Sequence, residues 1–205
     1  MTKLITVFSE YEIKNSAIKI NNGTDTGFKK VGCVGKIEET LDCITVTKKC
    51  EGVVKKTVTR GAGTGESKIT LHMNYNLYIQ IFGMDDENLL DGVYGYGTNS
   101  RHREFTYVGE VMDEDGNIKY KAYPKCAVKT GPSNTIENGG EEVQEIEVTF
   151  SLYPDDYGYC EYEAPAIELD DTTKGKWMTE FTPELLRKTP SQSPSQSPSQ
   201  SQGTV

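Results

Sequence analysis

Residues 105–123 read FTYVGEVMDEDGNIKYKAY, and this stretch decides the fold class. Two runs rich in aromatic and β-branched residues flank Asp113-Glu-Asp-Gly116, a tetrapeptide with the residues of a tight turn. The pattern predicts an antiparallel hairpin with strands over 105–112 and 117–123. The tetrapeptide also resembles the opening of a calcium loop, but its glycine stands at the fourth position instead of the sixth, so we interpret it as a turn.

Three segments upstream of this hairpin also have the composition of strands. Residues 37–48 and 53–60 are rich in Val, Thr and Ile, and a turn at Cys50-Glu51-Gly52 separates them. Residues 67–72 alternate between apolar and polar side chains. We therefore expect three strands here, the first two of which form a hairpin.

Residues 61–68, which join two of these strands, read GAGTGESK. The glycines approach a phosphate-loop pattern, but Glu66 stands where that pattern requires lysine, and both flanks have strand composition. We therefore expect residues 61–65 to form a flexible hairpin tip.

The most regular alternation in the chain runs over residues 142–152. Such a strand buries one face, and its second face meets water or a partner. The expected inward set is Ile146, Val148, Phe150 and Leu152, and the outward set is Glu145, Glu147, Thr149 and Ser151.

Two short helices fit the sequence. Residues 75–82 follow Asn74, a good N-cap, and end at Gly83, although the same residues also alternate as a strand would. Residues 183–188 begin with proline, which is favoured at the first helical position. Many strands with one or two short flanking helices predict a mainly β fold, either a β-sandwich or a partly closed barrel.

The end of the chain has a different composition. Residues 189–205 contain only Thr, Pro, Ser, Gln, Gly and one Val, with a repeat of Pro-Ser-Gln-Ser. A segment with nothing apolar to bury is expected to be disordered. We therefore expect one β domain over residues 1–188 and a disordered tract over 189–205, which is either a terminus or a linker to a further domain.

The overall composition excludes several classes of protein. The 205 residues include 22 basic and 31 acidic ones, a net charge of −9, which disfavours general binding to nucleic acid. No apolar run approaches the 18 residues of a membrane span, and we expect no export signal. Five cysteines, an odd number without a Cys-x-x-Cys pair, indicate free thiols in a reduced compartment.

The search for catalytic chemistry returns little. Adjacent carboxylates such as Glu38 and Glu39 face opposite sides of a strand and do not converge on one substrate atom. Five cysteines and two histidines, His72 and His102, lack the flanking sequence of a nucleophilic site. We therefore expect no enzyme activity, no cofactor and no metal. A hydrolase that uses a free cysteine remains the weakest alternative.

A tyrosine-rich segment offers a second alternative. Tyr153, Tyr157, Tyr159 and Tyr162 lie around Pro154 and Gly158. These rings either stack on sugars, which would make the chain a stand-alone acidic β-sandwich that binds carbohydrate, or pack at a loop or subunit contact.

Read in order, several segments resemble the major tail proteins of long-tailed bacteriophages, in particular those of temperate siphophages of Gram-positive hosts such as Listeria. Their order and spacing over most of residues 1–187 carry the resemblance. The segments are KIEETLD from residue 36, TKKCEGVVKKT from 47, LHMNYNLYIQIFGM from 71, DGVYGYG from 91, FTYVGEVMDEDG from 105, YPKC from 123, ENGGEEV from 137, YPDDYG from 153 and KWMTEFTPEL from 176.

The resemblance implies a structural virion protein whose copies form stacked rings, usually hexameric, around the channel through which the genome leaves the capsid. The implied partners are copies of the chain itself, the tape-measure protein, the tail-tip and tail-terminator proteins, and DNA in transit. It implies no reaction, no cofactor and no membrane insertion. The implied location is the tail of the virion, with assembly in the host cytoplasm.

Two sets of residues are candidate functional positions under this hypothesis. Glu145 and Glu147 are candidates for the channel wall, because a carboxylate-rich lining would keep the DNA duplex from binding to it. They fit an ordinary solvated face equally well. Two glycine-rich loops are candidates for contacts between subunits, at Gly61, Gly63 and Gly65 and at Gly92, Gly95 and Gly97.

Overall fold

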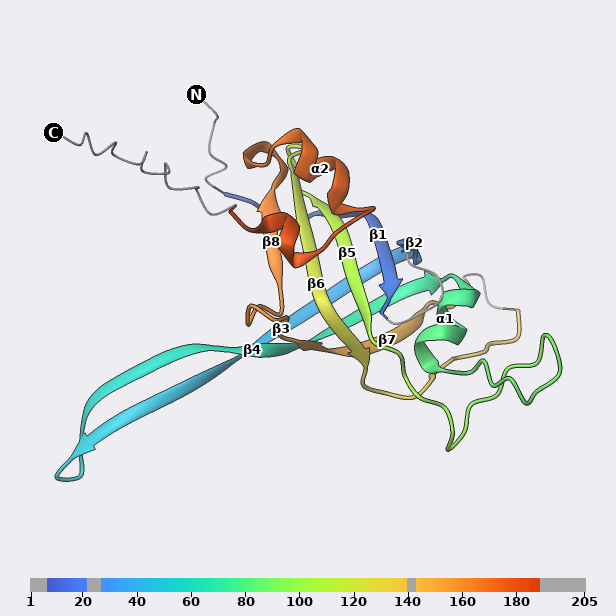
Figure 1. Ribbon diagram of the computed structural model, residues 1–205, viewed down its shortest axis with the longest axis horizontal. Coiled ribbons are helices and arrows are strands. Elements are labelled where there is room, and N and C mark those ends of the chain that lie inside the picture. The colour runs from blue at the N-terminus through green and yellow to red at the C-terminus, as the bar shows by residue number, and fades with distance from the viewer. Residues whose placement is uncertain (1–6, 22–26, 140–142, 189–205) are drawn as a thin grey trace, which may run out of the picture.

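The computed structural model describes residues 7–21, 27–139 and 143–188 (Figure 1). The disordered tract predicted over residues 189–205 lies outside the described residues. The elements in chain order are β1 (Glu12–Ile20), β2 (Lys29–Lys30), β3 (Gly32–Cys50), β4 (Val53–Met73), α1 (Tyr75–Phe82), β5 (Phe105–Met112), β6 (Ile118–Val128), β7 (Ile146–Tyr153), β8 (Tyr162–Pro165) and α2 (Asp171–Trp177), with short 3₁₀ helices at Ala166–Glu168 and Pro183–Leu186.

All eight strands of the described ranges belong to one antiparallel sheet. Its order is β2-β1-β5-β6-β7-β4-β3, and β8 pairs with β6 beside this path. The sheet does not close, because its two end strands, β2 and β3, do not pair with each other in the described ranges. The prediction of a mainly β fold with two short helices is confirmed. Two separate sheets, as in a sandwich, are not present in the described part of the chain.

The hairpin predicted from residues 105–123 is confirmed. β5 and β6 pair from Met112 opposite Ile118 through Tyr107 opposite Tyr123. At the turn, the Asp113 carboxylate accepts hydrogen bonds from the backbone N–H groups of Asp115 (3.0 Å) and Asn117 (2.7 Å). This side-chain to backbone bonding is the turn chemistry that the sequence indicated.

The central strands bury both of their faces, and each face carries a separate apolar cluster. On one face, the rings of Tyr107, Tyr123 and Phe150 lie with centroids 5.4–6.3 Å apart and pack with the buried side of α1. On the other face, Val108 and Ala122 pack with Trp177 of α2 and with Phe181. The expected inward residues Val148, Phe150 and Leu152 are all buried in the first cluster.

The helix prediction for residues 75–82 is confirmed, and the strand alternative is wrong. The Asn74 side chain accepts a hydrogen bond from the Asn76 N–H, and Gly83 ends the helix in the left-handed conformation with φ of 60°. Apolar residues would face the sheet whether residues 75–82 formed a helix or a strand. The capping residues at the two ends therefore favour the helix.

Two other expectations are corrected. Residues 61–65 do not form a hairpin tip, because they belong to the continuous strand β4. Residues 183–186 form only a 3₁₀ turn, whereas the helix that covers the second apolar cluster is α2, at 171–177. Glycine at position 175 weakened the helical pattern of α2 in the sequence.

The most unusual feature is the length of the β3–β4 hairpin. Its inner half pairs with β7, from Gly65 opposite Leu152 to Leu71 opposite Ile146. Its outer half, residues 43–60, projects away from the body at one end of the long axis (Figure 1), and we call it the arm. Every residue from 40 to 61 is exposed. At about 3.4 Å per residue, the arm reaches roughly 27 Å beyond the sheet.

Candidate functional site

The arm is a two-stranded ribbon with two chemically different faces. Because paired residues share a face, Ile44, Val46 and Val58 lie together on one side, in register with Arg60 and next to Lys48 and Lys56. Four threonines occupy the other side, where Thr45 Oγ1 lies 3.0 Å from Thr59 Oγ1 and Thr47 pairs with Thr57. The ribbon turns at Glu51 and Gly52, which have φ values of 52° and 79°, as the sequence predicted.

A waist separates the arm from the body. Leu41 pairs with Gly65 and Cys43 pairs with Gly61, so residues 62–64 of β4 stand opposite Asp42 alone. The Thr64 hydroxyl donates a hydrogen bond of 2.8 Å to Asp42 and closes this bulge. Gly65 is required here, because a Cβ at that position would lie 2.6 Å from the Thr40 carbonyl oxygen. Gly61, Gly63 and Gly65 are therefore waist residues rather than loop residues.

The charge of the arm opposes that of the rest of the chain. Residues 43–60 contain five basic side chains and one acidic one, a net charge of +4 within a chain of −9. None of the five has an acidic partner in the part of the chain that the structure describes. The five are Lys48, Lys49, Lys55, Lys56 and Arg60.

A buried ionic cluster ties the base of the hairpin to the body. Lys121 Nζ of β6 lies 2.7 Å from Glu39 of β3, 2.9 Å from Glu161 and 2.7 Å from Glu163 of β8. The Tyr123 hydroxyl donates a further hydrogen bond of 2.7 Å to Glu39. In the sheet, β7 and β4 lie between β6 and β3. The contact therefore joins two strands that are not neighbours, across one face of the sheet.

The cluster holds an excess of negative charge around the Lys121 ammonium group, and the Lys119 ammonium lies 3.2 Å from Glu163 at its margin. Burial raises the pKa of Glu161 to about 7, and the neighbouring carboxyl of Glu39 adds to the rise. Burial also acts on Glu163, but the hydrogen bond and charge of Lys121 hold its pKa below the usual value. Lys121 is held charged by its three carboxylates, which raise its pKa despite its burial.

These shifts predict that the folded state loses stability as the pH rises from about 4.3 to about 7. The folded chain holds a proton on Glu161 that the unfolded chain releases near pH 4.3, so unfolding becomes easier as the pH rises through the folded pKa. Partial solvent contact reduces the effect to about 1–2 kcal/mol. Glu161→Gln should remove most of this slope in urea titrations at pH 5.5 and 8. An unchanged slope in the variant would show that another group is responsible.

A loop at the opposite end of the molecule from the arm carries carboxylates and exposed apolar side chains. Residues 84–100, which we call the distal loop, contain four acidic residues and no basic one. The loop is held to α1 by the contacts of Tyr94 with Tyr75 and of Tyr96 with Phe82. The predicted loop glycines Gly92, Gly95 and Gly97 do lie in this loop.

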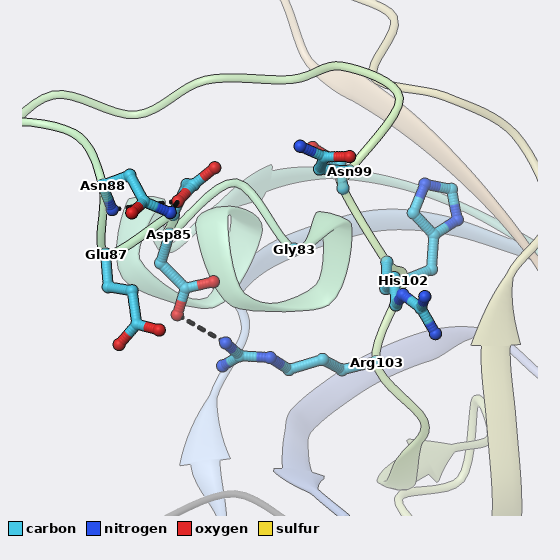
Figure 2. A pocket seen from close by; sticks show the side chains of 10 residues that line it. Gly83, Asp85, Glu87, Asn88, Asn99, His102 and Arg103 are labelled. Carbon is cyan, nitrogen blue, oxygen red and sulfur yellow. Dashed lines mark hydrogen bonds and ion pairs between the residues drawn. The ribbon is translucent and has the colours of Figure 1, made fainter.

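The base of the distal loop forms a surface cavity of about 580 Å³ (Figure 2). Asp85 pairs with Arg103 at 2.6 Å, and the Asp86 carboxylate accepts a hydrogen bond of 2.9 Å from the Asn88 N–H. His102, from the segment that follows the loop, bonds to the Val128 carbonyl at 2.8 Å and to the Tyr96 hydroxyl at 3.0 Å. The cavity is therefore polar, and two of its carboxylates, those of Asp85 and Asp86, make contacts that hold the loop in place.

The cysteine–histidine alternative is only partly supported by position. Cys33 of β3 lies opposite His72 of β4, and both line a second surface cavity of about 560 Å³. His72 Nε2 lies 4.0 Å from Glu145. No hydrogen bond joins Cys33 to His72 in the described ranges. The three groups are neighbours without the contacts that activate a thiol.

The two proposed wall residues differ in their surroundings. Glu147 lies in β7 and pairs with Lys68 at 2.8 Å, whereas Glu145 precedes the strand and reaches toward Gly35 and His72. The strand is therefore shorter than the predicted 142–152, and residue 142 lies outside the described residues. Both carboxylates are exposed, and whether they face a channel stays a prediction.

Some tyrosines of residues 153–162 make contacts within the chain. Tyr162 packs on Phe181, and its hydroxyl donates a hydrogen bond of 2.5 Å to Asp155. The guanidinium of Arg187 lies 4.4 Å from the Tyr157 ring centroid. Tyr153, Tyr157 and Tyr159 stay exposed, and whether they bind a sugar stays a prediction.

No family model matches the chain, and no curated protein sequence matches it. None of the helices that the structure describes has the length and apolar character needed to cross a membrane. Within the same ranges, no three His, Cys, Asp or Glu side chains are grouped as metal ligands.

Proposed function

We propose that the chain is a structural virion protein whose copies assemble into stacked rings, usually hexameric, that form the tube of a bacteriophage tail. The observation that carries this proposal is the arm. An ordered ribbon of 22 consecutive residues, from 40 to 61, is exposed along its whole length in the part of the chain that the structure describes. The assignment to a phage tail comes from the sequence resemblance. The open antiparallel sheet is compatible with the partly closed barrel that the resemblance implies.

The physics of the arm favours a role in association. A two-stranded ribbon alone in water is at best marginally stable, because it buries little apolar surface. The arm also exposes Ile44, Val46 and Val58 on one face and an unpaired strand edge on each side. Such edges are templates for pairing with another chain, and the charged side chains beside them limit uncontrolled aggregation.

The rest of the proposal follows from the resemblance. The further partners would be the tape-measure protein inside the growing tube, the tail-tip and tail-terminator proteins at its ends, and DNA in transit. The protein would act in the virion tail after assembly in the host cytoplasm. It would catalyse no reaction and need no cofactor.

Electron microscopy of the concentrated chain tests the proposal. We expect negatively stained preparations to contain rings or short tubes with a central channel, because no surface of the described chain covers the arm. Small separate particles at every concentration, together with retention on a carbohydrate array that is lost in Tyr159→Ala, would contradict it and favour the carbohydrate-binding alternative.

A further inference from the structure

We propose that the arm of one copy docks on the distal loop of the next copy, in a head-to-tail contact. This inference rests on the proposed function and adds to it the surface that receives the arm. It is argued from the chemistry of the two ends of the molecule.

The two surfaces are complementary in charge. The arm carries +4 and the distal loop carries −4. Glu87 and Asp91 are exposed and have no ion-pair partner among the described residues, whereas Asp85 is neutralised by Arg103. In Figure 2 no dashed contact joins the Glu87 side chain to the Asp85–Arg103 pair. The carboxylates of Glu87 and Asp91 could therefore pair with the basic side chains of the arm on another copy.

The two surfaces also share an exposed apolar component. Beside its carboxylates, the distal loop exposes Leu90 at 82%, with Leu89, Val93 and Tyr94 around it. Beside its cations, the arm exposes Val46 at 57% and Val53 at 59%. Apolar area supplies affinity, and the surrounding charges set orientation and exclude wrong pairings.

The positions of the two surfaces determine what such a contact builds. The arm and the distal loop lie at opposite ends of the long axis of the molecule (Figure 1). In an end-to-end arrangement, a copy that docks its arm on one neighbour keeps its own distal loop free to receive the arm of another. A contact between different surfaces closes into a ring when its rotation permits and otherwise extends into a filament.

Charge reversal tests the pairing. Lys55→Glu with Lys56→Glu gives a copy with acidic residues at both ends, and Glu87→Lys with Asp91→Lys gives a copy with basic residues at both ends. Each variant alone should need a concentration at least about tenfold higher to assemble, because the net charge of the substituted surface falls to zero and its new side chains meet like charges on the unsubstituted surface. A mixture of the two should assemble again, since the introduced carboxylates of one variant's arm then meet the introduced ammonium groups of the other variant's loop, and the unsubstituted arm and loop meet as before.

A matched control isolates the effect of position. Glu114→Lys with Asp115→Lys makes the same change in net charge as the loop variant, at the exposed β5–β6 turn, and should leave the assembly concentration unchanged. Circular dichroism of all variants checks that the fold is kept. If the unchanged chain forms no assemblies, the proposed function fails and takes this inference with it. If the unchanged chain assembles but the mixture does not recover, the docking inference alone is overturned.

Discussion

Lys121→Met should cost the fold about 3–5 kcal/mol, because it removes the cation of Glu39 and Glu161 from a partly buried site, whereas Glu163 keeps Lys119 at 3.2 Å. Glu39, Glu161 and Glu163 all lie within 3 Å of the Lys121 ammonium, and their side chains are 13–39% exposed. Methionine fills the space of the lysine stem but supplies no charge. The loss is measured by urea unfolding followed through the single tryptophan, Trp177, which is buried on Tyr120 and reports the core.

Lys125→Met on the same strand is the matched control. Lys125 is 44% exposed and lies 3.7 Å from Glu104, so its loss should change the unfolding free energy by less than about 1 kcal/mol. Adding Glu39→Gln and Glu161→Gln to Lys121→Met should recover part of the lost stability. A loss below 1 kcal/mol in Lys121→Met would mean that the cluster is solvated and does not hold β3 to the body.

Removal of the arm should abolish assembly and leave the domain folded. The change replaces residues 43–60 with Asn-Gly, so that a short loop connects Asp42 to Gly61 beside the intact waist. Because no residue of the arm is buried, the free energy of unfolding should change by no more than about 1 kcal/mol. Sedimentation velocity and electron microscopy at matched concentrations measure the loss of rings or tubes.

Substitutions that keep the length of the arm serve as the control for its removal. Exchange of all four threonines of the arm for serine keeps the length, the charges and the apolar face, and should allow assembly. Tubes formed by the armless chain would contradict the proposed role of the arm. A folding defect in the armless chain would instead show that the arm stabilises the body.

Local signals in the sequence predicted the elements that local chemistry determines. The turn at Asp113, the caps of the helix at 75–82 and the alternation of Val148, Phe150 and Leu152 each rest on neighbours within a few residues. The continuity of β4 through Gly61, Gly63 and Gly65 was missed, because glycine there serves close backbone approach at a bulge and not chain reversal.

The surfaces that matter for function depend on contacts between distant segments. The composition of residues 37–60 predicted strands, but nothing in it said that their outer half leaves the sheet. Lys121 and Glu39 are 82 positions apart and gave no signal as a pair. The basic excess of residues 43–60 was readable in the sequence, yet it acquires meaning only once those residues stand together at one end of the molecule.

The waist has a consequence for how the length of this protein can change. Because residues 62–64 take up the mismatch between the two strands, the body does not depend on how many residue pairs lie beyond Cys43 and Gly61. Insertion or deletion of two residues in each strand keeps every side chain on its face and shifts the tip by about 7 Å. The reach of the arm is thus a dimension that evolution or an engineer can lengthen or shorten in fixed steps, while the folded domain stays the same.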